Sequence, residues 1–339
     1  MQLGFFDEDK RYANIDKIGD KLVKINKSIY WEMFRPTIDK AFQDENKKAT
    51  GRPPYDRLMM FKIIILQQLY NLSDDQMELC LNDRLTFMRF VGLSISSKIP
   101  DAKTIWLFKE QLRIHNVHEE LFNMFYNYLE ATGYIAHEGN IVDATFVEVP
   151  KQHNNKKEND AIKNGEIPEE WLEPDNKNKL AQKDTDARWA KKNDELHYGY
   201  KDHVSVDSKS KLIKDYEVTD AAVHDSNKCV EFIDEKDKAF YADSAYYCEK
   251  ISSQIPVSMD NCILEKATRN HPLTSEQKQS NKERSRIRCR IEHVFGTMER
   301  QLGGIVIRCI GIERAKFQIC MKNFIYNIVR YTFLRKASL

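Results

Sequence analysis

The sequence predicts an α/β protein in which an all-helical N-terminal domain, residues 1–132, precedes an α/β domain at residues 133–339. Two observations support this prediction. Up to about residue 132, apolar residues recur at helical spacing, and capping residues separate the segments. After that point, β-branched segments alternate with helical ones in the order β, insert, β, β, α, β, α, β, α. This order is typical of parallel strands with an antiparallel hairpin attached.

The composition indicates a globular protein without a membrane span. Of the 339 residues, 41% are hydrophobic, which suffices for a sizeable core, and the formal net charge is only +1. The longest apolar stretch, residues 59–72, is interrupted by Lys62 and falls short of the ~18–20 apolar residues that cross a bilayer. The seven cysteines form no CxxC pair, and the N-terminus is too polar for a signal peptide. We therefore expect a cytoplasmic protein with reduced thiols.

Three helices are expected in the second half of the N-terminal domain. Residues 57–72 are apolar almost all round, so this helix should be buried. Ser73 and Gln76 form a capping-box pattern that opens a second helix, and Asp101 is a suitable N-cap for a third. The apolar face of the third helix would comprise Ile105, Phe108 and Leu112. Three short helices with tight connections suit a helix-turn-helix-like DNA-binding module, but they suit a plain helical bundle equally well.

The elements of the α/β domain follow from local composition. A β-branched, apolar strand is expected at residues 140–149, and two strands around a Ser-Lys-Ser turn should form a hairpin at 197–207 and 211–221. The remaining expected elements are a helix at 224–233, a strand starting near Asp237 and ending at Asp243, a weak strand at 255–259, and a helix carrying Glu292.

A polar segment at about residues 150–196 interrupts this domain. It is rich in lysine, acidic residues and asparagine and has few apolar residues, which predicts an inserted, partly disordered segment. Trp171 and Trp189 are unusual in such a composition. We expect them to dock on the core, and the alternative is that they stack on an unpaired nucleic-acid base.

Three acidic residues stand out by their context. Asp143 lies among apolar residues of a predicted strand, where a carboxylate is costly to bury unless it is paired or binds a cation. Asp243 ends a predicted strand, at the carboxyl edge where open α/β sheets build their sites. Glu292 lies at the margin of an apolar helical stripe, with Arg288 one turn away on the same side. That stripe comprises Ile287, Ile291, Val294, Phe295, Met298 and Leu302.

Each acid also has an ordinary structural interpretation. Asp143 could close a buried hydrogen-bond network, Asp243 could cap the next helix, and Glu292 could pair with Arg288. Together, however, three carboxylates from two strands and a helix could hold two Mg²⁺ ions about 3.5–4 Å apart, an arrangement suited to in-line phosphoryl transfer. Mg²⁺ takes such hard oxygen ligands and keeps positions open for water and phosphate oxygens. We therefore predict these three acids as catalytic metal ligands, with Mn²⁺ able to replace Mg²⁺.

The segments around these acids resemble those of the DDE transposases of bacterial insertion sequences, specifically the IS-four/IS-five-like superfamily. The resemblance runs from about Ile29 to Arg335, and the polar insert is its weakest part. It rests on five segments taken together: VDAT around Asp143, HYGYKDH at 197–203, EVTDAAVHDS at 217–226, YADSAY around Asp243, and RCRIEHVFGTMER around Glu292. The resemblance implies an RNase H-like mixed-sheet catalytic core, two divalent metal ions, and Asp143, Asp243 and Glu292 as the acidic triad. It also implies a double-stranded DNA substrate, cleavage to a 3′-hydroxyl, and strand transfer into target DNA.

The same resemblance suggests which basic residues contact DNA. The family's helix motif is Tyr-x2-Arg-x3-Glu-x6-Lys, and Arg288 and Glu292 match its arginine and glutamate. Ser285 stands at the tyrosine position and Glu299 at the lysine position. Arg300, the next residue, is therefore our candidate for holding the transposon-end phosphate. Lys201, on the adjacent hairpin, is a weaker candidate.

Further basic residues cluster around Glu292, namely Lys282, Arg284, Arg286, Arg288, Arg290 and Arg300. Phosphate contacts supply most nonspecific DNA affinity, so this cluster suits a DNA surface. Arg286 and Arg290 point away from Glu292, and for them a solvated helix face is the alternative. Many relatives read Ala-Asp-Lys-Gly-Tyr at the second acid, whereas this chain reads Ala-Asp-Ser-Ala-Tyr and lacks that lysine. His224, in a family-typical HDS motif, could lie near the metals, but we favour a role as a helix cap.

Taken together, the sequence predicts a DNA transposase that binds insertion-sequence ends and catalyses metal-dependent strand cleavage and strand transfer. The helical N-terminal domain would bind the DNA ends, which favours a transposase over the first alternative, an RNase H-like metal-dependent nuclease. The intact triad argues against the second, a transposase-derived DNA-binding protein without catalysis. A purely structural helical protein would leave Asp143 and Asp243 unexplained. Because two ends must be brought together, we expect at least a homodimer on DNA, associated with the nucleoid.

Overall fold

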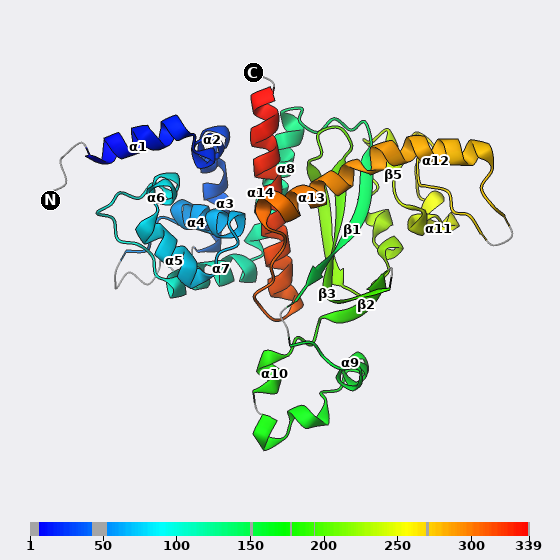
Figure 1. Ribbon diagram of the computed structural model, residues 1–339, viewed down its shortest axis with the longest axis horizontal. Coiled ribbons are helices and arrows are strands. Elements are labelled where there is room, and N and C mark those ends of the chain that lie inside the picture. Colours follow the sequence, from blue (N-terminus) through cyan, green and yellow to red (C-terminus); the bar gives the residue numbers. More distant parts are fainter. Residues whose placement is uncertain are drawn as a thin grey trace. The chain divides into compact units, whose positions relative to one another are not determined.

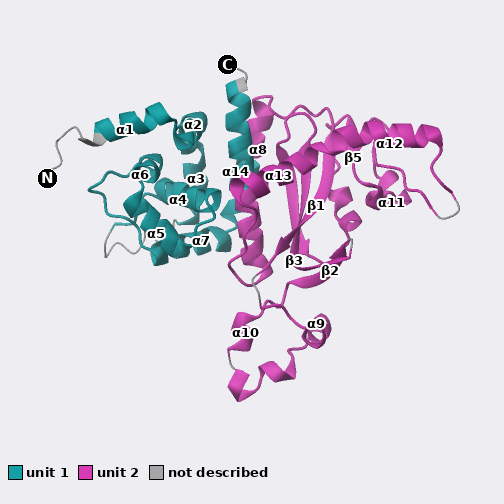
Figure 2. Cartoon of the chain, viewed as in Figure 1, with its two compact units in different colours: residues 1–125, 324–339 teal, residues 126–323 magenta. Residues whose placement is uncertain are grey.

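The computed structural model describes residues 7–42, 53–149, 152–176, 178–192, 194–268 and 271–337. The chain divides into two compact units, which Figure 2 colours separately. Unit 1 comprises Met1–Phe125 and Phe324–Leu339, and unit 2 comprises Tyr126–Asn323. The C-terminal residues thus belong to the same unit as the N-terminal region. The division of function between residues 1–132 and 133–339 stays a prediction.

The described elements of unit 1 are all helices. They are α1 (Asp7–Ile18), α2 (Lys21–Ser28), η1 (Trp31–Phe34), α3 (Arg35–Ala41), α4 (Arg57–Leu69), α5 (Asp74–Asp83), α6 (Leu85–Val91), α7 (Ala102–Ile114), part of α8 (Val117–Ala131) and part of α14 (Ile312–Ala337). Nine of the 13 residues of α4 are buried, which confirms the prediction of a helix that is covered on all sides. Phe34, Phe61, Phe125 and Phe324 form an aromatic cluster that ties the C-terminal helix to this unit, with neighbouring ring centroids 5.5–5.9 Å apart where they pack on Phe324.

The predicted helix caps of unit 1 are present. The Ser73 hydroxyl accepts a hydrogen bond from the Gln76 backbone N–H, and the Gln76 side chain accepts one from the Ser73 N–H. Asp101 Oδ1 accepts from the Thr104 N–H at 2.7 Å, and Ile105, Phe108 and Leu112 are buried as expected. These caps supply partners for the backbone donors that a helix N-terminus leaves unpaired.

Unit 2 contains a six-stranded mixed sheet. Its strands are β1 (Asn140–Glu148), β2 (Arg188–Lys192), β3 (Glu195–Asp207), β4 (Ile213–Asp220), β5 (Ala239–Tyr241) and β6 (Asp260–Asn261). The order is β2-β3-β1-β5-β6, and β4 pairs with β3. β3 and β4 form the predicted antiparallel hairpin, whereas β1, β5 and β6 run parallel. The helical unit followed by a mixed sheet confirms the predicted α/β fold class.

One glycine of the hairpin is required by its surroundings. Gly199 has φ +153°, and a Cβ atom at this position would lie 2.2 Å from the carbonyl oxygen of Val147 on the neighbouring strand. A side chain would therefore separate β3 from β1, the strand that carries Asp143. This explains the glycine in the HYGYKDH segment.

Two predicted elements of unit 2 have a different secondary structure from the one expected. The helix expected at 224–233 is a pair of 3₁₀ turns, η5 (Asp225–Asn227) and η6 (Cys229–Phe232). Residues 255–259 are not a strand, and β6 begins one residue later. In both places only a short stretch is apolar, and packing against neighbouring strands decides the backbone conformation.

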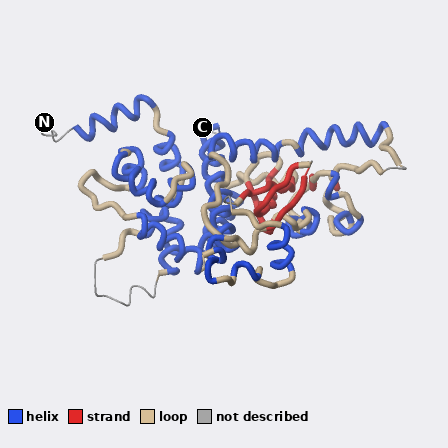
Figure 3. Tube along the Cα trace, turned by 60° about the horizontal axis from the view of Figure 1, so that its bottom comes forward, coloured by secondary structure: helices blue, strands red, loops and turns tan. Residues whose placement is uncertain are grey.

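The helix carrying Glu292 is interrupted rather than continuous. α12 (Ser275–Arg288) ends at Cys289, and α13 (Arg290–Leu302) begins there. The Glu292 N–H bonds to the carbonyl oxygen of Cys289, three residues earlier, as in a 3₁₀ turn. α13 contacts β1 and α12 contacts β5 along one side of the sheet, as Figures 1 and 3 show. The break therefore lies next to the strands that carry the acidic residues.

The polar insert forms short helices in its described residues, and its partial disorder stays a prediction. It contains α9 (Lys156–Lys163), η3 (Glu169–Trp171), η4 (Pro174–Asn176) and α10 (Lys179–Gln182), which form a green lobe below β2 in Figure 1. Trp171 is 2% exposed and donates to Glu158 at 2.8 Å, and Lys183 pairs with the same carboxylate. Trp189 on β2 donates to the Asn154 carbonyl.

Both tryptophans are thus engaged within unit 2. The Trp189 ring lies 4.9 Å from that of Tyr198 on β3, which confirms docking for this residue. Trp171 packs inside the insert itself. The insert has few aliphatic residues, and its described contacts are instead made by Trp171, Trp189 and the Glu158–Lys183 ion pair. No helix in the described part of the chain is both long and apolar enough to cross a bilayer.

Candidate active site

Asp143 lies in β1, between β3 and β5. Its neighbours Val142 and Ala144 are buried, whereas the Asp143 side chain keeps 18% of its surface exposed. Its Oδ1 accepts the Ala144 N–H at 2.8 Å. Burial raises the pKa of the Asp143 carboxyl above its ordinary value, and the Ala144 N–H and the Arg288 charge act in the opposite direction. The acid is therefore enclosed but reachable.

Asp243 lies at the matching position of the adjacent parallel strand. Ile141 of β1 pairs with Tyr241 of β5, so Asp143 and Asp243 both follow that pair by two residues. Parallel strands bring such positions to the same edge of the sheet. Asp243 is the N-cap of η7 (Ser244–Tyr246), and its carboxylate accepts the Ser244 N–H. Its negative charge also contributes to the raised pKa of Asp143.

Glu292 is joined to Asp143 through Arg288. Arg288 Nη1 lies 3.2 Å from Asp143 Oδ2, and Nη2 lies 2.5 Å from Glu292 Oε1. Glu292 sits in the first turn of α13 with 58% of its side chain exposed. The expected apolar stripe lies beneath it. Ile291, Val294, Met298 and Leu302 are buried, whereas Ile287 and Phe295 are half-buried. Asp143 and Asp243 therefore follow paired positions of adjacent strands, and a single guanidinium bridges Asp143 to Glu292, but the ligand atoms of the three acids do not all lie within 4.8 Å of one another.

Two buried hydrogen-bond donors beside these acids have no partner in the described part of the chain. They are the Tyr246 hydroxyl and Arg288 Nε. Tyr246 is 1% exposed and packs in one cluster with Val142 and Ala242, the residues that precede Asp143 and Asp243. Leaving a buried donor unpaired costs about 1–3 kcal/mol. Three carboxylates with unpaired donors among them are a set that a hydrated Mg²⁺ ion and a phosphate oxygen would complete.

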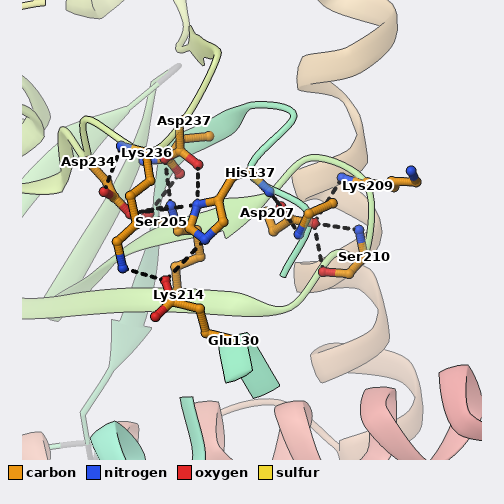
Figure 4. A network of polar contacts seen from close by, with 12 residues as sticks. Glu130, His137, Ser205, Asp207, Lys209, Ser210, Lys214, Asp234, Lys236 and Asp237 are labelled. Atoms are coloured by element: carbon orange, nitrogen blue, oxygen red, sulfur yellow. Dashed lines mark hydrogen bonds and ion pairs between the residues drawn. The ribbon is translucent and has the colours of Figure 1, made fainter. Parts of the chain in front are cut away.

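A second charged cluster of unit 2 contains the one group of described residues whose ligand atoms lie close enough for a metal ion: His137, Asp234 and Asp237. Figure 4 shows His137 between two carboxylates, with Nδ1 3.1 Å from Asp237 and Nε2 3.1 Å from Glu130. Lys214 Nζ lies 3.0 Å from Asp234 and 2.5 Å from Asp237. An ammonium group thus already neutralises these acids. We interpret the cluster as a structural ion-pair network.

The two further DNA-binding candidates lie in different environments. Arg300 is exposed in the last turn of α13, and no ion pair involves it in the described residues. Lys201, by contrast, has a side chain that is 9% exposed. Its Nζ donates to the Val223 carbonyl and to Asp225, both at 2.7 Å. A phosphate contact by Lys201 would leave Asp225 unpaired, so this geometry does not favour the predicted DNA contact.

Two other basic or titratable candidates have structural partners. His224 is the N-cap of η5 and accepts the Ser226 N–H, which confirms the capping interpretation. Arg290 Nη1 donates to the Ser208 carbonyl at 2.8 Å, so it is not on a freely solvated face. The Arg290 contact joins segments 82 residues apart, so no local sequence pattern predicts it.

A cavity of about 450 Å³ lies along β1 and α13. Its lining includes Thr145, Phe146, His197, Phe295 and Met298. The rings of Phe146 and His197 are stacked with centroids 4.2 Å apart. Thr145 follows Asp143 by two residues on the same face of β1, but none of the three acids lines the cavity.

Asp202 in β3 is a buried acid that sequence reasoning missed. It is 0% exposed, and its Oδ1 accepts a hydrogen bond from Asn323 Nδ2 at 3.1 Å. Burial raises its pKa to about 8. Asp202 Oδ2 and Asn323 Oδ1 both lack a partner among the described residues. The Asp202 carboxyl is therefore expected to be protonated at neutral pH.

Comparison with known families yields two matches. A family model described as "Transposase DDE domain" matches residues 135–328, more than half of the chain, and this range includes all three acids. A second family model, described as "Transposase domain (DUF772)", matches residues 10–111, within the helical unit 1. No solved structure matches the chain.

Proposed function

The chain belongs to the DDE transposases, and from this premise we propose that it binds insertion-sequence ends and catalyses metal-dependent DNA cleavage and strand transfer. The observation that carries the proposal is that Asp143 and Asp243 follow paired positions of adjacent parallel strands and that Arg288 links Asp143 to Glu292. We propose that the sheet with α12 and α13 is an RNase H-like catalytic core. The helical unit 1, which contains the second family match, would bind the DNA ends.

Asp143, Asp243 and Glu292 would hold the divalent cations. Bound Mg²⁺ or Mn²⁺ would lower the pKa of an attacking water or 3′-hydroxyl and stabilise the departing 3′-oxygen. The protein contributes by fixing the ligands beforehand. Asp243 is oriented by the Ser244 N–H, and Asp143 is oriented by the Ala144 N–H. Glu292, at 58% exposure, is the acid that DNA and solvent reach most easily.

Arg288 has two roles in this proposal. Without a metal ion, its guanidinium neutralises Asp143 and Glu292, which would otherwise face each other as like charges. Its unpartnered Nε leaves a donor for a phosphate oxygen of the DNA strand. Arg300, exposed three turns further along this helical region, would contact a phosphate outside the acidic site. Synapsis of two DNA ends would require at least two copies of the chain.

The test is cleavage of a labelled duplex carrying the element's own end, in Mg²⁺, Mn²⁺ or EDTA. Wild type should nick the end only with metal, and Glu292→Gln should not. Glu235→Gln makes the same change of charge on an exposed residue of unit 2 outside the acidic site and should leave nicking intact. Nicking without joining to a target would indicate a nuclease. Binding without cleavage in any metal would indicate a DNA-binding derivative, and Glu292 would then be only the ion-pair partner of Arg288.

A further inference from the structure

α12 has no buried residue, and one side of it is anchored by polar contacts. Gln277 Nε2 lies 2.5 Å from Glu265 Oε2, and Asn281 exchanges two hydrogen bonds of 3.0 Å with the Glu265 backbone. Arg284 donates to the Ile263 carbonyl at 2.9 Å. These positions recur every three to four residues and define one helix face, which Arg288 continues towards Asp143.

A second face of α12 carries Lys278, Lys282 and Arg286. All three are exposed, and in the described part of the chain none of their side chains forms a hydrogen bond or ion pair. They are spaced four residues apart, so they form one stripe, turned by roughly 100–160° from the anchored face at about 100° per residue. Figure 1 shows α12 extending beyond the edge of the sheet. The stripe is therefore accessible along its length.

Intrinsic helix stability does not account for this stripe. Like charges at i, i+4 destabilise a helix by about 0.2–0.5 kcal/mol per pair. Lys278 lies in the first turn, where the helix dipole disfavours a cation. The nearest acid on the same helix, Glu283, accepts a hydrogen bond from Gln279 instead of pairing with a cation of the stripe. A partner that brings negative charge from outside would remove this repulsion.

The spacing suits a nucleic-acid backbone. From Lys278 to Arg286 the helix rises about 12 Å, at ~1.5 Å per residue. Each DNA strand carries one phosphate per about 3.4 Å of helix axis, so the stripe spans roughly three to four phosphates. Its last member, Arg286, lies two residues from Arg288, which contacts Asp143. Along the helix axis the stripe thus ends within one turn of Arg288, on a face turned away from it.

We propose that Lys278, Lys282 and Arg286 form a track for the phosphate backbone of duplex DNA that flanks the cleavage site. The helix that carries this track is fixed to the loop at 263–265 by hydrogen bonds from Gln277, Asn281 and Arg284. The proposal rests on the proposed function and adds the surface along which the substrate lies. Because backbone contacts position DNA without reading its sequence, the track contributes to nonspecific affinity.

The test is the salt dependence of binding to a duplex of random sequence, in EDTA and in a Glu292→Gln background, so that no cleavage occurs. Replacing Lys278, Lys282 and Arg286 together by Gln should reduce the magnitude of the slope of log K against log[KCl] by about 2.7, at ~0.9 per phosphate contact. As a control, Lys191, Lys209 and Lys228 undergo the same change of charge. They are lysines of unit 2 already paired with acids, and the slope should not change.

Two outcomes would overturn the track. One is an unchanged slope in the triple variant, and the other is an equal decrease in the control. Arg284→Gln should lower the melting temperature through its lost anchor while the slope stays constant. If wild type cleaves no DNA and the triple variant still shows a reduced slope of log K against log[KCl], the proposed function is wrong but the proposed DNA track is supported. If wild type cleaves DNA and the triple variant has the same salt slope as wild type, only the proposed DNA track is wrong.

A different observation, the unpartnered Tyr246 hydroxyl, supports a second inference. Tyr246 follows Asp243 by three residues and donates its backbone N–H to the Asp243 carbonyl at 3.0 Å. Its ring packs with Val142 and Ala242, each of which directly precedes one of the two aspartates. Burial raises the pKa of this phenol, and the charge of Asp143 raises it further. A phenylalanine would fill the same space without a buried donor.

We infer that Tyr246 is a positioning residue whose hydroxyl donates to the Asp143 carboxylate once that group turns from Arg288 to a bound cation. Mn²⁺-dependent thermal stabilisation tests this. Tyr246→Phe should melt no lower than wild type in EDTA, because the hydroxyl has no partner there, but should bind Mn²⁺ about tenfold more weakly. Tyr247→Phe, at a 50% exposed neighbour, is the control. Equal Mn²⁺ affinity in Tyr246→Phe and wild type would overturn the role of Tyr246 alone. A wild type that Mn²⁺ does not stabilise would overturn the metal site itself.

Discussion

Two charged clusters of unit 2 differ in how completely their groups are paired. In the network of His137, Asp234 and Asp237, two lysines and a histidine face three carboxylates, and Figure 4 shows contacts on every side. In the acidic site, one guanidinium pairs with two of the three carboxylates, and two buried donors have no partner among the described residues. A network that only stabilises the fold satisfies its own groups. A site that binds something leaves groups for the ligand to satisfy.

The largest effect should come from Asp243→Asn. This substitution keeps the size of the side chain and removes a metal-ligand charge, so metal-dependent cleavage should fall by roughly 10³-fold or more, or ~4 kcal/mol. End binding should change little, because the residue lies at the sheet edge rather than on the basic faces. Cleavage assays and equilibrium binding on the same labelled end would measure both. Normal cleavage would remove Asp243 from the triad.

Lys214→Met should reduce the stability of the fold rather than act directly on cleavage. The Lys214 side chain is 4% exposed, and that of its partner Asp237 is fully buried. Removing one member of a buried pair typically costs about 3–5 kcal/mol, which urea unfolding would detect. Lys236→Met removes an exposed lysine of the same network and should cost less than about 1 kcal/mol. Equal small losses in both variants would contradict a structural role for the buried pair.

Asp202 sharpens the comparison because it is a buried acid without a counter-cation. Its folded-state pKa, about 8, lies above the ordinary value of 3.8, so the folded state binds the extra proton between these limits. Stability should therefore be highest below pH 4 for this group alone, and its contribution should fall by up to ~1.4 kcal/mol per pH unit as pH rises towards 8. Asp202 Oδ2 and Asn323 Oδ1 both lack a partner among the described residues, and protonation turns the carboxyl into a donor.

Asp202→Asn isolates this contribution. The variant should lose the part of the pH dependence that belongs to Asp202, and it should be more stable than wild type at pH 8.5. Urea unfolding of both proteins at several pH values between 5 and 9 would measure it. Parallel pH profiles for variant and wild type would show that Asp202 does not carry the proton.

The smallest effect should come from Arg300→Ala. An exposed arginine that contacts one phosphate contributes about 0.9 to the slope of log K against log[salt]. The variant should bind the element's end more weakly and with a flatter salt dependence, and its cleavage after binding should be unaffected. An unchanged slope would exclude Arg300 from the phosphate contacts.

Local interactions explain which features could be predicted from sequence. The capping box at Ser73, the N-cap at Asp101 and the hairpin of β3 and β4 depend on residues close together in the chain. The strand around Asp143 and the apolar stripe beneath Glu292 depend on periodicity, which is also local. Partners distant in sequence were not predictable. Lys201, which was predicted to contact DNA, pairs with Asp225, and in the insert Glu158 pairs with Lys183.

The sequence by itself determined that this protein has a helical region followed by an α/β core with three acids in unusual contexts, because hydrophobic periodicity and capping act within a few residues. Only the tertiary structure decided that Arg288 bridges Asp143, 145 positions away, to Glu292, and that His137 joins Asp237 a hundred positions later. The helix break at Cys289 separates the basic face of α12 from Glu292 on α13, and it too is visible only in the fold. Such contacts depend on which strands and helices pack together, and packing is a property of the whole chain.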